Sequence, residues 1–466
     1  MNLLLKTAFR NIFRNTRRSL MTISAIAVGA MSMLLFGEFV NYIVLGLQTN
    51  AVKQGGHVAL FRNGYFKYGS GNPSAYGIPD YSSVISLLSQ DPLLKSRIAV
   101  ITPTINLFGI AGNFDADVSK TFFGVGLVPL DYRQMQKWDE YDMGRGYPRS
   151  ETGLVDDDIT RGFVGAGVGR ILGLCKPLHL TDCPSKQPPI ISGSPSLNRD
   201  FSSLTGRDKD LTSRDQNSTL PRLDLLAGTT AGAPNVVSLY VDRAVPLGVK
   251  ELDDSFIGMH FNLAQQLLFG RSEHQAISIV LQFHNTEEMS PARARIEQLI
   301  REKRLDLEVR DLLELQPFYK QVVSMFGSIF SFIAAIMGVI VLFMVINTMS
   351  MSVMERTQEI GTLRALGVKR KGIRLQFLIE GLIIGVLGAT AGILLGSAAA
   401  EIINHAGLTW LPPGQAAPVP LNVLTNRSGG LMFGIWLGLC LMAALASFIP
   451  ANRAARMKVV DALGHV

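Results

Sequence analysis

The sequence contains little charge for its length. Only 17% of its 466 residues are Asp, Glu, Lys or Arg, whereas 47% are hydrophobic and the mean hydropathy is positive. A large soluble protein needs more charge to cover its surface, so this balance favours a membrane protein. The net charge of +7 does not indicate nucleic-acid binding, because residues 48–318 hold slightly more acidic than basic residues and no basic patch.

The chain also lacks the common catalytic signatures. It contains no Gly-Lys pair, which excludes the phosphate-binding loop G-x-x-x-x-G-K-[ST], so we expect any ATPase to be a separate chain. The hydrolase patterns H-E-x-x-H, G-x-S-x-G and S-x-x-K are absent as well. The acidic run Asp156 to Asp158 fits a solvated loop better than a metal site. We therefore predict a non-catalytic protein, with an unrecognised active site outside the membrane as the alternative.

Long uncharged runs define the organisation of the chain. A helix needs about 20 apolar residues to cross a bilayer, and residues 19–47, 319–352, 375–404 and 428–450 each provide them. The first run is too long for the hydrophobic part of a signal peptide, so we interpret it as a retained anchor. The predicted fold is an α-helical membrane protein with four transmembrane helices and a large domain inserted between the first two.

Basic residues lie almost entirely on one side of these spans. The short loop at 405–427 contains Arg427 alone, and the other flanks contain the rest. Because Lys and Arg stay in the cytoplasm, both termini (1–18 and 451–466) and the connection at 353–374 are expected there, and residues 48–318 on the opposite face. The basic flanking residues are Lys6, Arg10, Arg14, Arg17, Arg18, Arg356, Arg364, Lys369, Arg370, Lys371, Arg374, Arg453, Arg456 and Lys458.

The N-terminal segment 1–18 alternates apolar and basic residues at helical spacing. This pattern predicts an amphipathic helix lying in the lipid headgroup region, with a solvated basic tail as the alternative. The first two spans are longer than a bilayer is thick, so we expect them to tilt or to emerge as a stalk that carries the outer domain.

The outer region 48–318 reads as an α+β domain. His57 to Phe61 and Ala276 to Phe283 have the composition of strands, and Ser290 to Arg304 has a helical repeat. Residues 184–234 are rich in Pro, Ser, Gly, Asn and Asp, which indicates a long flexible excursion. Cys175 and Cys183 fit either a disulfide in an oxidising compartment or two free thiols.

Glycines recur along the third span. Small residues four positions apart allow a second helix to approach closely, although glycine is also generally tolerated in membranes. These packing positions are Gly381, Gly385, Gly388, Gly392 and Gly396, and the fourth span repeats the pattern at Gly430, Gly434 and Gly438. The acids inside the spans are Glu38, Glu380 and Glu401. We expect Glu380 to reach the cytoplasmic interface or to pair with a base there, and an ion-driven transporter would need more acids at mid-depth.

The connection between the second and third spans contains an amphipathic pattern. Ile360, Leu363 and Leu366 form an apolar ridge, while charged residues occupy the other faces and Gly367 stands where a helix should stop. Such a helix suits docking into a groove of another protein, with a polar loop as the simpler interpretation. The charged positions are Glu355, Arg356, Glu359 and Arg364.

The same residues carry a family resemblance. "ERTQEIGTLRALG" at 355–367, "QFLIEGLIIGVLGATAGILLG" at 376–396, "AFRNIFRNTRRSL" at 8–20 and "PANRAARMKVVDAL" at 450–463 resemble the MacB/FtsX family of ABC transporter permeases. The outer segment "GHVALFRNGYF" at 56–66 is similar to its lipoprotein-releasing LolC/LolE type. Val459, where a proline is usual, and the very basic Lys369 to Lys371 depart from the pattern.

The resemblance implies a type VII ABC permease in the bacterial inner membrane, with the outer domain in the periplasm. It implies that residues 353–374 hold the coupling helix that meets a cytoplasmic ABC ATPase dimer, which binds ATP and Mg²⁺. The implied coupling residues are Glu355, Arg356, Glu359, Ile360, Gly361, Leu363, Arg364 and Gly367. It also implies a second permease, a copy or a paralogue, and motion of the outer domains without substrate crossing the membrane.

Two hypotheses for the function follow. In the first, the chain works with that ATPase to release a lipoprotein or to export an amphiphile, with membrane lipids and a periplasmic adaptor or chaperone as further partners. In the second, it is an FtsX-like mechanical regulator that switches a periplasmic enzyme or sensor. A lipid-modified client would support the first hypothesis, and a soluble enzyme the second.

Overall fold

The computed structural model describes residues 10, 14, 16–69, 71–143, 152–181, 183, 220–229, 232–247, 250–270, 274–411, 418–424 and 429–457. The chain divides into two compact units. The first comprises Met1–Leu45, Phe318–Trp410 and Pro420–Val466, and the second comprises Gly46–Pro317 and Leu411–Val419. The predicted amphipathic segment 1–18 lies mostly outside the described residues.

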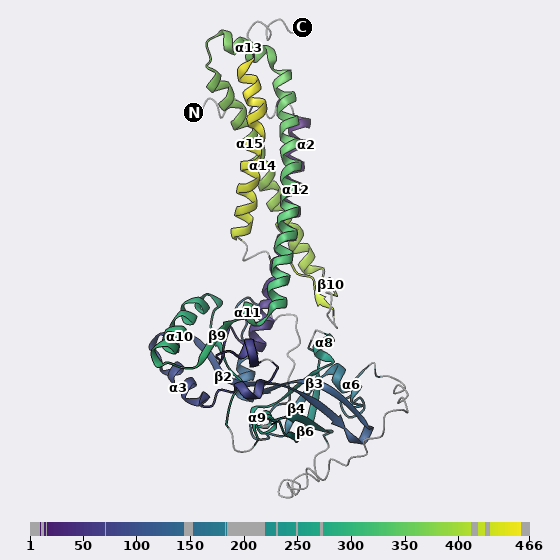
Figure 1. Ribbon diagram of the computed structural model, residues 1–466. Helices are drawn as coiled ribbons and strands as arrows, with labels where there is room; N and C mark the ends of the chain where they lie inside the picture. The colour runs from purple at the N-terminus through teal and green to yellow at the C-terminus, as the bar shows by residue number, and fades with distance from the viewer. Residues whose placement is uncertain are drawn as a thin grey trace. The chain divides into compact units, whose positions relative to one another are not determined.

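Within the described residues, four helices of the chain are long and apolar enough to cross a membrane. They are α2 (Thr16–Gly55), α12 (Pro317–Glu355), α14 (Arg370–His405) and α15 (Gly429–Arg456), drawn as long coils in Figure 1. The short helix α13 (Thr357–Ala365) lies between α12 and α14 in the sequence, and the strands β10 (Thr409–Trp410) and β11 (Val419–Pro420) lie between α14 and α15. The helices extend past the predicted spans because polar residues continue them.

The glycines of α14 form one packing stripe that meets two different helices. A Cβ atom added to Gly385 would lie 2.7 Å from Cβ of Ala443 in α15, and one added to Gly388 would lie 2.7 Å from Cβ of Ile26 in α2. Gly381 likewise faces α15, while Gly392 and Gly396 face α2. Close backbone approach therefore holds α14 between its two neighbours, as expected of small residues in membrane helices.

The glycines of α15 behave differently. A Cβ atom added to Gly430, Gly434 or Gly438 would meet no atom within 4 Å. Gly434 and Gly438 instead line an apolar cavity of about 300 Å³ together with Gly338 of α12. The repeat of small residues in the fourth span therefore does not mark a close helix contact among the described residues, but leaves a cavity that α2 and α12 also line.

Strands of the second unit form a ring that continues into an open sheet. In the described residues, the order is β3-β7-β4-β6-β5-β2-β8-β1-β9, and β3 also pairs with β2, which closes the first six strands. The long strand β2 (Ile98–Asn113) belongs to both parts. The others are β1 (Val58–Arg62), β3 (Val118–Leu127), β4 (Arg161–Gly165), β5 (Arg222–Gly228), β6 (Pro234–Val245), β7 (Phe256–His260), β8 (Ser278–Phe283) and β9 (Leu307–Asp311).

Helices complete the two lobes of this unit (Figure 1). The almost fully buried α9 (Phe261–Phe269) packs against β2, β3, β5, β6 and β7 of the ring. The open sheet shares a core with α3 (Tyr81–Gln90) and α10 (Met289–Lys303). The remaining helices are η1 (Tyr65–Gly69), η2 (Pro73–Tyr76), α4 (Pro92–Lys95), η3 (Phe114–Ala116), α5 (Pro129–Met135), α6 (Ala166–Ile171), α8 (Lys250–Asp253), η6 (Thr286–Glu288) and α11 (Leu312–Leu315).

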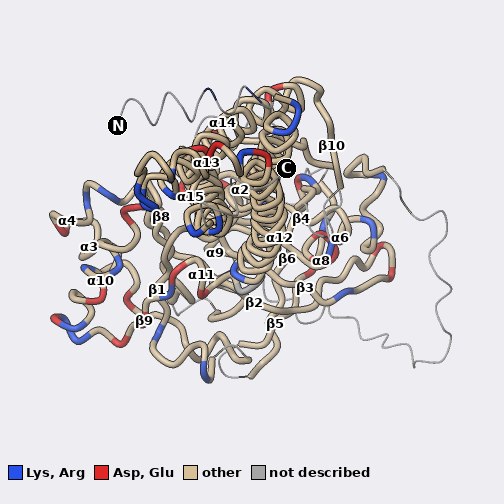
Figure 2. The backbone as a smooth tube through the Cα atoms, turned by 90° about the horizontal axis from the view of Figure 1, so that it is seen from above, with Lys and Arg blue, Asp and Glu red and all other residues tan. Residues whose placement is uncertain are grey.

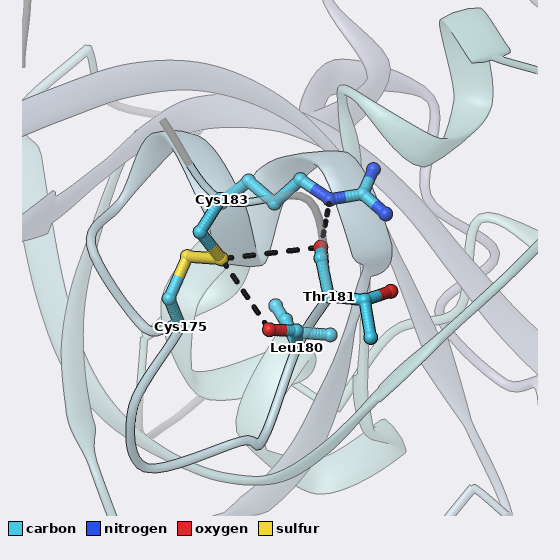
Figure 3. The surroundings of a disulfide bond; sticks show 5 residues. Cys175, Leu180, Thr181 and Cys183 are labelled. Carbon is cyan, nitrogen blue, oxygen red and sulfur yellow. Dashed lines mark hydrogen bonds between the residues drawn. A yellow bond between two sulfur atoms is a disulfide. The ribbon is translucent and has the colours of Figure 1, made fainter. Parts of the chain in front are cut away.

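A disulfide joins Cys175 to Cys183 just after α6, with an S–S distance of 2.04 Å. Figure 3 shows the loop between them, in which the carbonyl oxygens of Leu180 and Thr181 lie near the Cys183 sulfur. Most of the predicted excursion at 184–234 lies outside the described residues. Its last part is not an excursion, because Arg222–Gly228 pairs with β6 and β2 as strand β5.

A buried histidine makes the stability of the second unit dependent on pH. His57 is 0% exposed, and its Nδ1 accepts a hydrogen bond of 3.1 Å from the backbone N–H of Phe283, which only an unprotonated Nδ1 can do. Burial lowers the pKa of His57 from 6.5 to about 4. The unfolded chain therefore binds a proton first as the pH falls.

We expect this histidine to remove about 3 kcal/mol of stability as the pH falls from about 6.5 to about 4, with none of its effect above that range. The measurement is the thermal unfolding midpoint of the detergent-solubilised protein between pH 8 and pH 4. In the His57→Asn variant, the amide oxygen replaces the Nδ1 acceptor, and this part of the pH dependence should disappear. An unchanged pH slope in that variant would contradict the assignment.

Candidate functional site

The connection between α12 and α14 is built around a break at one residue. Arg356 separates the end of α12 from the start of α13, with φ −109° and ψ 19°, and its carbonyl oxygen accepts a hydrogen bond from Ile360. α13 ends after Ala365, and Gly367 follows with φ +89°, a conformation that favours glycine. The chain therefore turns sharply twice within a short segment.

One face of α13 is buried in the first unit. Ile360 is 3% exposed and joins a core with Ile373 and Phe377 of α14. Gly361 is also buried. Arg356, predicted to offer its charge to a partner, is only 6% exposed, because its side chain points inward from the break. This face anchors the connection to α14.

The acidic residues of the segment have partners within the chain. Arg356 Nη1 lies 3.0 Å from Glu380 Oε1 of α14, and Arg18 Nη1 lies 2.7 Å from Glu355 Oε1. Arg14 donates two hydrogen bonds of 2.6 and 3.1 Å to Glu359, which lower the pKa of that carboxyl.

These three ion pairs show that charged residues of the segment also have partners within the chain, and their predicted contact with an ATPase stays a prediction. The expectation that Glu380 pairs with a base is confirmed. Figure 2 shows acidic and basic residues close together near α13. The other intramembrane acids differ in burial, since Glu38 is 1% exposed and the Glu401 side chain is 62% exposed beside His405.

The exposed part of the connection is apolar and basic. Leu363 and Val368 are each 37% exposed and Leu366 is 77% exposed. We call these three residues the α13 tip. The predicted ridge of Ile360, Leu363 and Leu366 does not share one environment, because Ile360 is buried whereas Leu366, the C-cap residue of α13, is exposed. Lys369, Arg370 and Lys371 follow and are also exposed.

Asp156 and Asp158 of the acidic run in the second unit form ion pairs. Asp158 Oδ2 lies 2.9 Å from Arg161, and Asp156 pairs with Arg133, whose hydrogen bond lowers the pKa of Asp156. Among the residues that the structure describes, no group of three or more His, Cys, Asp or Glu side chains is arranged to hold a metal ion.

Comparisons with known proteins match parts of this chain. Residues 331–459 match the family "FtsX-like permease C-terminal". The chain is 30% identical over 196 residues to the macrolide export ATP-binding/permease protein MacB of Hyphomonas neptunium, covering 42% of this chain and 28% of that protein. It is 36% identical over 121 residues to MacB of Neisseria gonorrhoeae, covering 26% of this chain and 17% of that protein.

Two further similarities extend the comparison. The uncharacterized ABC transporter permease YknZ of Bacillus subtilis is 27% identical over 221 residues, covering 47% of this chain and 51% of that protein. The crystal structure of the periplasmic region of MacB from Actinobacillus actinomycetemcomitans matches with a TM-score of 0.27 and 10% identity, covering 58% of this chain and 95% of that one.

The matches thus span less than a third of the two MacB proteins and about half of YknZ. The sequence similarity and the matched C-terminal region, which contains α13, α14, α15 and most of α12, agree on the same assignment. Residues 331–459 therefore form an FtsX-like permease C-terminal region, and the chain is similar to ABC transporter permeases that include MacB and YknZ.

Proposed function

We propose that this chain couples ATP hydrolysis by a separate cytoplasmic ABC ATPase dimer to movement of the second unit, through the α13 tip. The observation that carries the proposal is the exposure of Leu366, a large apolar side chain, beside basic residues just after an otherwise anchored helix. An apolar contact of this kind, flanked by charges, suits a groove on a partner protein. ATP and Mg²⁺ would bind to that partner.

The proposed orientation places both termini and α13 in the cytoplasm and the second unit in the periplasm of a bacterium. The excess of Lys and Arg at the termini and between α12 and α14 supports it. A second permease, either a copy or a paralogue, would complete the transporter. Surface labelling that reached Val368 from the periplasmic side would contradict this orientation.

The second unit holds the last turns of α2 by hydrogen bonds, which supports a mechanical role. Gln282 in β8 donates to the carbonyl oxygen of Val52 at 3.3 Å, and Gln136 donates to that of Lys53 at 3.0 Å. Val52 is 0% exposed and packs with Trp138. A movement of α2 would therefore be passed to the strands of this unit through the same contacts.

We propose that the movement serves the release of a lipoprotein or the export of an amphiphile, as in a LolC/LolE-like transporter. The sequence of the outer segment 56–66 supports the lipoprotein-releasing type. In the alternative, an FtsX-like regulator, the same movement would switch a periplasmic enzyme or sensor.

Affinity isolation of the tagged chain in mild detergent tests the proposal. We expect an ABC ATPase to copurify, together with a second permease and an acylated client. An equally tagged membrane protein of another family serves as the control for nonspecific recovery. Recovery of a soluble periplasmic hydrolase in place of an acylated client would support the regulator, and the absence of any ATPase would contradict the coupling role.

A further inference from the structure

The break between α12 and α13 is fixed to α14 by a buried ion pair. Arg356 is the residue at the break, and its guanidinium lies 3.0 Å from the carboxylate of Glu380. The side chains are 7% and 3% exposed. Glu380 precedes Gly381, at which α15 approaches α14 closely, and both residues are buried.

Stability alone does not account for such a pair. Removing two charges from water is costly, and replacing a buried pair by apolar residues of similar volume is often neutral or stabilising. What a buried guanidinium and carboxylate provide is a directional contact that no apolar side chain can replace. Ionisable residues inside membrane helices are accordingly functional candidates by default.

The other two ion pairs of the same segment are more exposed to solvent. The side chains of Arg14 and Glu359 are 52% and 54% exposed, and those of Arg18 and Glu355 are 32% and 38% exposed. Exposed pairs are weak and are screened by salt, so they can exchange when a partner approaches α13. The pair of Arg356 and Glu380 is buried, so neither salt nor an approaching partner reaches it.

We propose that Arg356 and Glu380 form a positioning pair, which makes α14 move with the α12–α13 break when α13 is displaced. Without the pair, α13 would tilt about Arg356 and leave α14 in place. Ile360, one turn further along α13, packs in the same core as Ile373 and Phe377 of α14. It provides a second contact between α13 and α14. The inference rests on the proposed function, since it requires a partner that displaces α13.

Two cysteine reporters test this transmission in the complete transporter in liposomes. One is Thr362→Cys, at an exposed position of α13, and the other is Ile402→Cys, near the far end of α14, where Ile402 is 70% exposed. Maleimide labelling rates are compared without nucleotide and with ATP and vanadate. In the wild-type background, we expect both rates to change by about fivefold or more. In Glu380→Gln, the rate at Thr362→Cys should still change and the rate at Ile402→Cys should not.

A matched control separates positioning from general stability. Thr22→Val removes a buried hydrogen bond of 2.6 Å between Thr22 of α2 and Thr348 of α12, neither of which belongs to α13 or α14, and both reporters should keep their response. Exchanging the charges in Arg356→Glu with Glu380→Arg should restore part of the response. If Glu380→Gln does not fold, Glu380→Asp retains the charge with a shorter reach, and the same selective loss is expected.

The outcomes are distinguishable. A persisting response at Ile402→Cys in the folded Glu380 variant, alongside a normal response at Thr362→Cys, overturns the inference and leaves the proposed function intact. Absence of a nucleotide response at both reporters in the wild-type background, with the ATPase present and active, overturns both.

Discussion

Replacing Gly392 with leucine should prevent α14 from packing on α2, with loss of most of the folded protein. A Cβ atom at this position would lie 2.5 Å from Cβ of Ala30 and 2.9 Å from Cα of Ala27, and it would also meet the Ala27 carbonyl oxygen. These neighbours are backbone and short side chains, which cannot move aside. Overpacking a tight core typically costs about 1–3 kcal/mol, so Gly392→Ala should already lower the unfolding midpoint measurably.

The matched control for this prediction is Gly434→Ala on α15. A Cβ atom there would meet nothing within 4 Å, and alanine favours a helix over glycine by about 1 kcal/mol. Fluorescence-detected size-exclusion chromatography after heating in detergent compares the variants. Equal unfolding midpoints for Gly392→Ala and Gly434→Ala would show that the α14 stripe does not hold the helices together.

Replacing Leu366 with aspartate should weaken binding of the partner ATPase by about 10- to 100-fold, because an apolar anchor at the centre of an interface contributes about 2 kcal/mol or more. Leu366 is 77% exposed, so its removal should leave the fold of the isolated chain unchanged. Titration of the copurified ATPase against the detergent-solubilised permease measures the affinity.

Leu93→Asp is the control for this change. Leu93 is 55% exposed on α4 of the second unit, where an added carboxylate meets no proposed interface. It should bind the ATPase as the wild type does. Wild-type affinity in Leu366→Asp would mean that the ATPase does not use the α13 tip, whatever else the chain contacts.

Local patterns in the sequence predict the elements of this protein well. Uncharged runs longer than a bilayer thickness leave few alternatives to long helices, and α2, α12, α14 and α15 coincide with them. The alternation around His57 to Phe61 and the apolar run from Ala276 to Phe283 correspond to β1 and β8. These signals are local because each depends on neighbouring residues only.

The features that local patterns did not predict depend on contacts between residues far apart in the sequence. The six-strand ring depends on β2 pairing with β5, whose residues lie more than a hundred positions away, and strand composition does not specify such partners. Likewise, Arg14 and Glu359 are 345 positions apart. Glycine spacing indicated a close helix contact on α14 but not that two helices share it, and the same spacing on α15 marked no contact with another described helix.

Strand β2 limits how the second unit can deform. Ile98–Thr104 is hydrogen-bonded to β8 of the open sheet, whereas Ile105–Asn113 is hydrogen-bonded to β3 of the ring. Rotating one lobe against the other would require breaking backbone hydrogen bonds on both sides of a continuous 16-residue strand, and a slip by one residue would turn every inward side chain outward. We therefore expect a load applied to one lobe to reach the other through the backbone hydrogen bonds of β2.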